Sequence, residues 1–124
     1  MAATVSSGPV AAQGAVGIGL ACLPASAESA ALCGQLRDVI DSGHNAGVVT
    51  LTTPDALGGY AKAVRLHIED LRADSLSAHL EWRGPGQDWQ RGATLTLDTM
   101  DTTISPSLSG QFLRDLWSHS RTGL

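Results

Sequence analysis

Two strictly alternating segments, separated by a short polar stretch, are the clearest hydrophobic pattern in the chain. In residues 64–68 and 76–82 every even-numbered position is apolar and every odd-numbered position is polar. Since successive side chains of a strand point to opposite faces of a sheet, this alternation predicts a β-hairpin with one apolar face. We expect its turn at residues 70–74.

The register of this hairpin decides which polar side chains meet. One register pairs Arg65 with Glu81 and His67 with His79, and registers shifted by two residues keep the same faces but change the pairs. The sequence does not choose among them. We expect the polar face of the sheet to be left to solvent. The residues expected on it are Arg65, His67, Glu69, Ser77, His79, Glu81, Thr94, Thr96 and Asp98.

Helical spacing of apolar residues marks two further segments. Residues 27–42 follow a capping serine and end at Gly43, and a second helix begins at Ser105-Pro106, with serine as N-cap and proline in the first turn. Short β-branched or alternating segments at 48–52 and 94–98 are typical of strands.

The expected order of elements is β-α-β-β-β-β-α. It predicts an α+β fold, with a single mostly antiparallel sheet of about five strands and two helices packed on one face. The chain has 124 residues, which fits one domain. We expect that domain at 14–120, after a flexible N-terminal tail at 1–13 and before a C-terminal tail at 121–124.

The first 27 residues contain no lysine or arginine and admit three interpretations. They could be a signal peptide that ends in Ala25-Ser26-Ala27, but the positive n-region is absent. They could carry a lipoprotein anchor at Cys22, although the preceding residues match a lipobox poorly. We prefer the third interpretation, a buried first strand at 15–23 preceded by a loose tail.

Cys22 and Cys33 are the two cysteines of the chain. If the first ends a strand and the second lies in the following helix, their Cα atoms come within disulfide range. We therefore predict a disulfide, with two free buried thiols as the alternative. The bridge favours a periplasmic or secreted protein over a cytoplasmic one.

Composition argues against nucleic-acid binding and against a membrane span. The net charge is −4, from 8 basic and 12 acidic residues, and the arginines are scattered singly along the chain. A nucleic-acid surface needs a concentrated basic face, so we expect no nucleic-acid binding. No apolar run approaches the length of a membrane span, so we expect no such span.

Candidate chemistry is sparse. His67 and His79, with Glu69 or Glu81 beside them, could supply part of a metal site, but a third ligand is not assured. No nucleophile motif or dinucleotide fingerprint occurs. We therefore predict no catalytic residue, no cofactor and no metal, and we favour a protein that is not an enzyme over one that is.

Two tryptophans flank the Gly-Pro-Gly loop of the second half. Trp82 lies on the apolar face and is expected in the core, whereas Trp89 is either a lid over the sheet edge or a contact for a partner. The candidate binding residues are Trp89, Arg65, His67, His79 and Glu81.

No motif identifies a family. In its order of elements, over roughly residues 15–119, the chain resembles small partner-binding domains of bacterial envelope proteins, such as the N-terminal domain of TolB and the outer-membrane lipoproteins that regulate cell-wall synthases. The resemblance implies a non-catalytic, exported domain that binds or assembles with a protein partner in the bacterial cell envelope, and it leaves the oligomeric state open. This hypothesis predicts no deep pocket.

Two alternatives belong to other classes. A small-ligand or glycan-binding module would use the Trp82–Trp89 loop and needs a groove beside residues 83–92. A metal-dependent protein would use His67 and His79, and needs their ring nitrogens near a common point.

Overall fold

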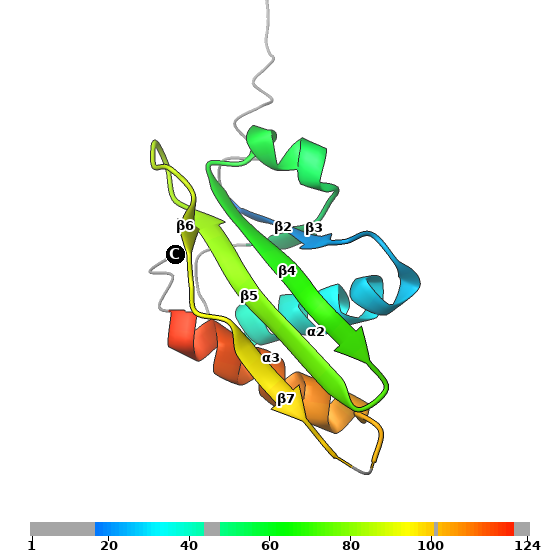
Figure 1. Cartoon of the computed structure of the whole chain (residues 1–124). Coiled ribbons are helices and arrows are strands. Elements are labelled where there is room, and N and C mark those ends of the chain that lie inside the picture. The colour runs from blue at the N-terminus through cyan, green and yellow to red at the C-terminus, as the bar shows by residue number, and fades with distance from the viewer. Residues whose placement is uncertain (1–16, 44–47, 101, 121–124) are drawn as a thin grey trace, which may run out of the picture.

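The computed structural model describes residues 17–43, 48–100 and 102–120. In this part of the chain, one open six-stranded sheet carries two helices on one face (Figure 1). The α+β class is therefore confirmed. The elements are β2 (Ile18–Leu23), α2 (Ala27–Gly43), β3 (Val49–Leu51), the 3₁₀ helix η1 (Pro54–Gly59), β4 (Lys62–Arg72), β5 (Ser75–Arg83), β6 (Gln90–Arg91), β7 (Leu95–Asp98) and α3 (Pro106–Ser120).

The strands follow the spatial order β3-β2-β4-β5-β6, and β7 also pairs with β5. β2 is parallel to both of its neighbours, β3 and β4, whereas β5 is antiparallel to β4, β6 and β7. The antiparallel meander therefore begins at β4, and β3 lies beyond β2 at the far edge. Parallel neighbours arise here because α2 and then η1 carry the chain back between successive strands.

β2 is the strand around which the sheet is built. Its residues from Ile18 to Cys22 are buried on both faces of the sheet. The helix-facing side packs with Leu36 and Ile40 of α2 in the main core. The strand interpretation of the N-terminal segment is thus confirmed over residues 18–23. Gly17 of the expected strand is a bend, and residues 15–16 and the two predicted tails lie outside the described residues.

The predicted disulfide is present between Cys22 of β2 and Cys33 of α2, with 5.9 Å between the two Cα atoms. α2 can begin so soon after β2 because its first turn is capped. Ser29 N–H donates to Ser26 Oγ at 3.1 Å, and Ser26 N–H donates to Ser29 Oγ at 3.0 Å. This reciprocal cap fixes the direction of α2, so that its second turn brings Cys33 over the end of β2.

The bridge closes a short loop, because only 11 positions separate the two cysteines. We expect reduction by dithiothreitol to lower the free energy of unfolding by about 2–3 kcal/mol, since the unfolded chain regains the entropy of that loop. Urea titrations of the oxidised and reduced protein would measure the difference. A double Cys22→Ala, Cys33→Ala variant should be insensitive to dithiothreitol, and equal stability of oxidised and reduced wild type would contradict the expectation.

The β4–β5 hairpin adopts the register that pairs Arg65 with Glu81 and His67 with His79. The pairing shifts by one residue between Ile68 and Asp70, which makes Glu69 the extra residue of a β-bulge. The prediction of a turn at 70–74 is wrong, because both strands continue further into this segment. Only two residues, 73 and 74, join β4 to β5. Because the bulge adds one residue to β4, Leu71 pairs with Leu76.

The expectation that the second sheet face is left to solvent is also wrong in part. Ala21 and Ala63 on this face are fully buried, together with Leu57 of η1, and Trp89 packs against them. Tyr60 lies directly over Gly19. The sequence pattern missed this cover because it comes from irregular segments, η1 and the loop before β6, which have no periodicity.

Gly19 allows this close contact, since a Cβ at its position would lie 2.6 Å from the Tyr60 ring. We expect Gly19→Ala to destabilise the fold by about 1–3 kcal/mol through overpacking, measured by urea denaturation. Gly34→Ala is the matched control: a Cβ there meets nothing within 4 Å. In the interior of α2 it should stabilise by about 0.5–1 kcal/mol. Loss of stability in both variants would contradict the proposed contact.

α3 closes the helix layer. Ser105 caps it as expected, because Leu108 N–H donates to Ser105 Oγ at 3.2 Å. Leu113 and Leu116 of its apolar stripe are fully buried in the main core. Ser109 Oγ donates to Oε1 of Gln35 at 2.7 Å, which ties α3 to α2.

Candidate site on the polar sheet face

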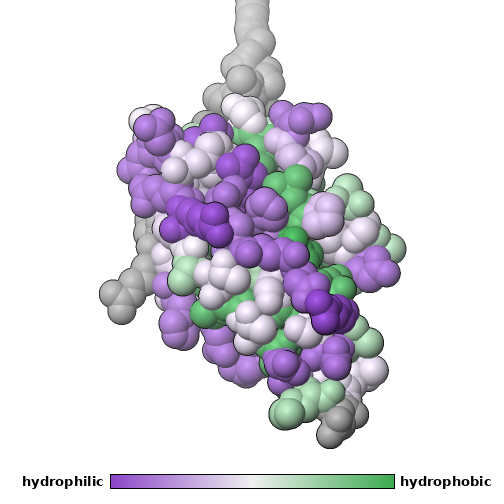
Figure 2. Space-filling model, viewed as in Figure 1, coloured by the Kyte–Doolittle hydropathy of each residue, from purple (hydrophilic) through white to green (hydrophobic). Residues whose placement is uncertain are grey.

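The candidate binding residues of the hairpin meet on the sheet face opposite the helices. Figure 2 shows hydrophilic surface across the middle of this face, over β4 and β5. The hairpin register brings Arg65 beside Glu81 and His67 beside His79. Four of the five candidate residues therefore form one cluster, and Trp89 joins it through Arg65.

His79 is the centre of this cluster, and it is buried, with a relative exposure of 2%. Both ring nitrogens face carboxylates. Nδ1 lies 2.6 Å from Oε2 of Glu69, and Nε2 lies 3.2 Å from Oε2 of Glu81. A buried imidazole held at both nitrogens has a fixed ring orientation, which is unusual for a residue expected to be exposed to solvent.

Glu69 reaches His79 because it is the extra residue of the bulge. Its Oε2 also accepts a hydrogen bond from Oγ1 of Thr94 at 2.5 Å, and the guanidinium of Arg91 lies 3.7 Å away. The hydrogen bonds from Thr94 and His79 hold the pKa of Glu69 below its ordinary value, against the opposing effect of burial. Glu69 is therefore an ionised partner of His79, although it lies outside the regular pairing of β4 with β5.

Glu81 divides its two oxygens between neighbours. Oε2 faces His79, and Oε1 accepts from Nη2 of Arg65 at 2.8 Å. Burial raises the pKa of Glu81, but the hydrogen bond from His79 and the positive charge of Arg65 outweigh it, so the pKa lies below the ordinary value. The Arg65 guanidinium in turn lies 3.8 Å from the centroid of the Trp89 ring.

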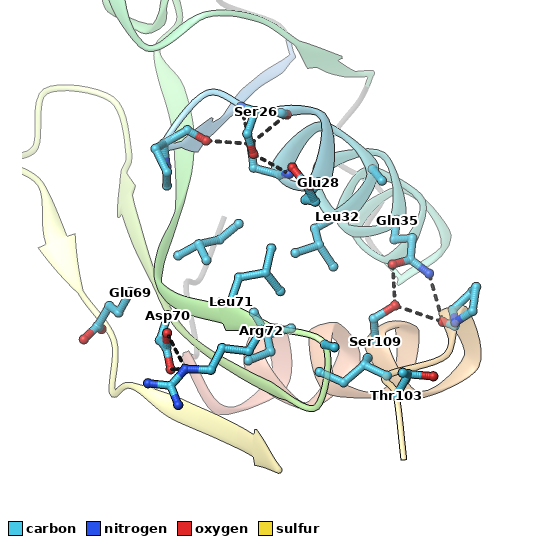
Figure 3. Close-up of a pocket in the computed structure, with 18 residues that line it drawn as sticks. Ser26, Glu28, Leu32, Gln35, Glu69, Asp70, Leu71, Arg72, Thr103 and Ser109 are labelled. Atoms are coloured by element: carbon cyan, nitrogen blue, oxygen red, sulfur yellow. Dashed lines mark hydrogen bonds and ion pairs between the residues drawn. The ribbon is translucent and has the colours of Figure 1, made fainter. Parts of the chain in front are cut away.

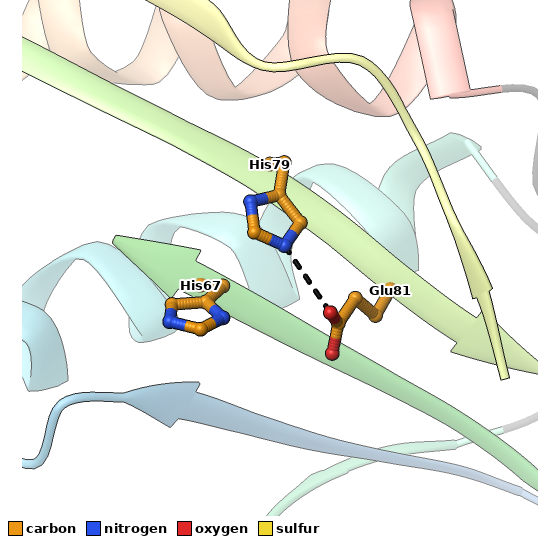
Figure 4. A group of neighbouring side chains, drawn as sticks. All are labelled: His67, His79 and Glu81. Carbon is orange, nitrogen blue, oxygen red and sulfur yellow. Dashed lines mark hydrogen bonds and ion pairs between the residues drawn. The ribbon is translucent and has the colours of Figure 1, made fainter. Parts of the chain in front are cut away.

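His67 completes the group from β4. Its ring lies 4.8 Å from that of His79, centroid to centroid, with the planes tilted by 38°. One potential ligand atom from each of His67, His79 and Glu81 lies within 4.8 Å of the others. Figure 4 shows the three side chains together over β4 and β5. The nitrogens therefore lie near a common point, as the metal-dependent alternative requires.

The sequence left two roles open for Trp89, a lid over the sheet edge or a contact for a partner. In the structure Trp89 occupies the lid position. It is half-buried, and Arg65 and Arg83 both approach its ring. Arg83 also donates through Nη2 to the carbonyl oxygens of Leu57 and Tyr60, at 3.1 and 3.0 Å. These bonds hold η1 against β5, so Arg83 is a positioning residue for this face that sequence patterns gave no reason to select.

A wide groove lies elsewhere, between the N-terminal ends of α2 and α3 and the tip of the β4–β5 hairpin (Figure 3). Its volume is about 1090 Å³, and Leu32 and Leu71 point into it. The protein-partner hypothesis did not expect a pocket of this size. The groove does not involve residues 83–92, where the glycan-binding alternative needs one.

The lid role of Trp89 can be tested by truncation. We expect Trp89→Ala to cost about 2 kcal/mol, less than the 3–5 kcal/mol of a fully buried tryptophan, because it uncovers Ala21, Ala63 and Leu57. Asp88→Ala, at an exposed neighbouring position, is the control and should leave stability unchanged. Chemical denaturation compares them. An unchanged midpoint for Trp89→Ala would contradict the lid role and favour a free binding surface.

Comparison with known proteins gives a likeness of fold. No family model and no curated protein sequence matches the chain. A PelC dodecamer from Paraburkholderia phytofirmans superposes with a TM-score of 0.57 at 11% identity, over 84% of this chain and 87% of that one. A variant PelC dodecamer from the same organism gives a TM-score of 0.59 at 9% identity, over 87% and 89%. At these identities the similarity concerns the fold alone.

Across the described ranges, no helix is both long and apolar enough to cross a membrane.

Proposed function

We propose that this chain is an exported, non-catalytic domain of the cell envelope that assembles with protein subunits, and that its first partner is another copy of itself. The exposed edge of β3 is the observation that carries the proposal. β3 ends the strand order, and no strand within the described ranges pairs with its outer side. An open edge of this kind presents free N–H and C=O groups to a further chain.

The sequence of this edge lacks the usual protection against pairing. Residues 48–53 contain no charged side chain and no proline. Val48 and Leu51 are exposed to 71% and 39%, which is high for large apolar residues. An uncharged, β-branched edge with exposed apolar side chains is suited to a permanent neighbour.

Two further observations support the proposal. The Cys22–Cys33 bridge is typical of proteins that leave the cytoplasm, because disulfides persist in oxidising compartments. The fold is shared with subunits that form dodecamers, over most of both chains. A shared fold does not fix function, so the similarity suggests self-assembly as the first form of association to test.

The test is the solution mass of the oxidised chain, measured by light scattering after size exclusion. We expect a multiple of the chain mass for the wild type. The double variant Val48→Asp, Leu51→Asp should shift to a monomer with an unchanged thermal midpoint, because two charges on an exposed edge oppose pairing without touching the core.

Leu108→Asp on α3 is the matched control, since Leu108 is 38% exposed, almost the same as Leu51. It should leave the assembly intact. A wild type that stays monomeric at every concentration would overturn self-assembly. Dissociation by Leu108→Asp but not by the edge variant would move the interface to the helix layer.

A further inference from the structure

Beyond assembly, the cluster around His79 brings three potential metal ligands together on the sheet face. Nδ1 makes the shorter contact, so its hydrogen is donated to Glu69. Nε2 faces the Glu81 carboxylate oxygen at 3.2 Å, and both of these atoms carry lone pairs when the ring has a single proton. Two lone pairs at this distance repel each other unless a positive centre lies between them. That centre is either a second ring proton or a metal ion.

We propose that His67, His79 and Glu81 bind a divalent transition-metal ion, with zinc as the first candidate. Two histidines and a glutamate are an established zinc donor set. Ligand atoms about 2.0–2.2 Å from a tetrahedral zinc are roughly 3.3–3.6 Å apart from each other. The distance of 3.2 Å between Nε2 of His79 and the oxygen of Glu81 is close to this edge length.

His67 distinguishes a metal ion from a proton. A proton shared by His79 and Glu81 gives no role to the third residue, yet the ligand atoms of all three lie within 4.8 Å of one another. The side chain of His67 is exposed, so a small rotation brings its nitrogen to the ion without disturbing the core.

The residues around the three ligands also fit. A histidine that binds metal typically donates its other N–H to a carboxylate, and His79 does so to Glu69. Thr94 and Arg91 hold Glu69 in place, and Arg65 holds the second oxygen of Glu81. The ligands are therefore fixed from behind by contacts that do not involve the ion, which is the arrangement of a preorganised site.

The test is zinc binding by the full oxidised chain, measured by competition with a chromophoric chelator, with cobalt(II) as a spectroscopic probe of geometry. We expect one zinc ion per chain and the intense visible bands of tetrahedral cobalt. His67→Ala removes an exposed ligand, so it should fold normally and weaken zinc binding at least about 100-fold. Glu69→Gln should weaken it about 10–100-fold, as for other residues that orient a ligand.

His119→Ala is the control, because His119 is exposed on α3, away from the sheet face. It should bind zinc as the wild type does. Equal affinity in His67→Ala and wild type would overturn the site, as would the absence of stoichiometric zinc binding in a folded wild type. Each chain carries its own site, so the result does not depend on whether the chain self-assembles.

Discussion

The position of β2 between two parallel neighbours is the constraint on which the rest of the structure depends. Six consecutive residues, Ile18–Leu23, must be small or apolar on both faces, because α2 covers one side and η1 with Tyr60 covers the other. The disulfide and the serine cap then fix α2 against the end of the same strand. β4 pairs with β2 along the whole length of β2, and this pairing fixes where the hairpin lies in the sheet.

The polar cluster is a consequence of that hairpin. The register places His67 beside His79 and Arg65 beside Glu81, and the bulge adds Glu69. Polar groups on a sheet face usually interact weakly because water surrounds them. Here His79 is buried and held between Glu69 and Glu81, so the hydrogen bonds within the cluster are stronger and its geometry is more specific. This is why the same face offers both a structural lid and a candidate metal site.

Regular elements could be predicted from the sequence, because periodicity and caps determine them locally. The α2 segment, the hairpin strands, the Ser105 cap and the Cys22–Cys33 bridge all follow from patterns within a few residues. The bulge at Glu69 could not be predicted, since it depends on how the residues of the two strands pair near the tip of the hairpin. Burial of His79 was missed for a related reason: the side chains that contact it, Glu69 and Glu81, are placed by the bulge and by the strand pairing.

The functional form that we propose is the exported, oxidised chain that keeps its first described strand, β2. The most direct test is the intact mass of the protein recovered from its native host, after thiol alkylation, with and without reductant. We expect the non-reduced chain to carry no alkyl group and to weigh two hydrogen atoms less than the mass calculated with two free thiols, and the reduced chain to carry two alkyl groups, with residues 18–23 retained. Two alkylated thiols without reductant, or a chain that begins after β2, would contradict it.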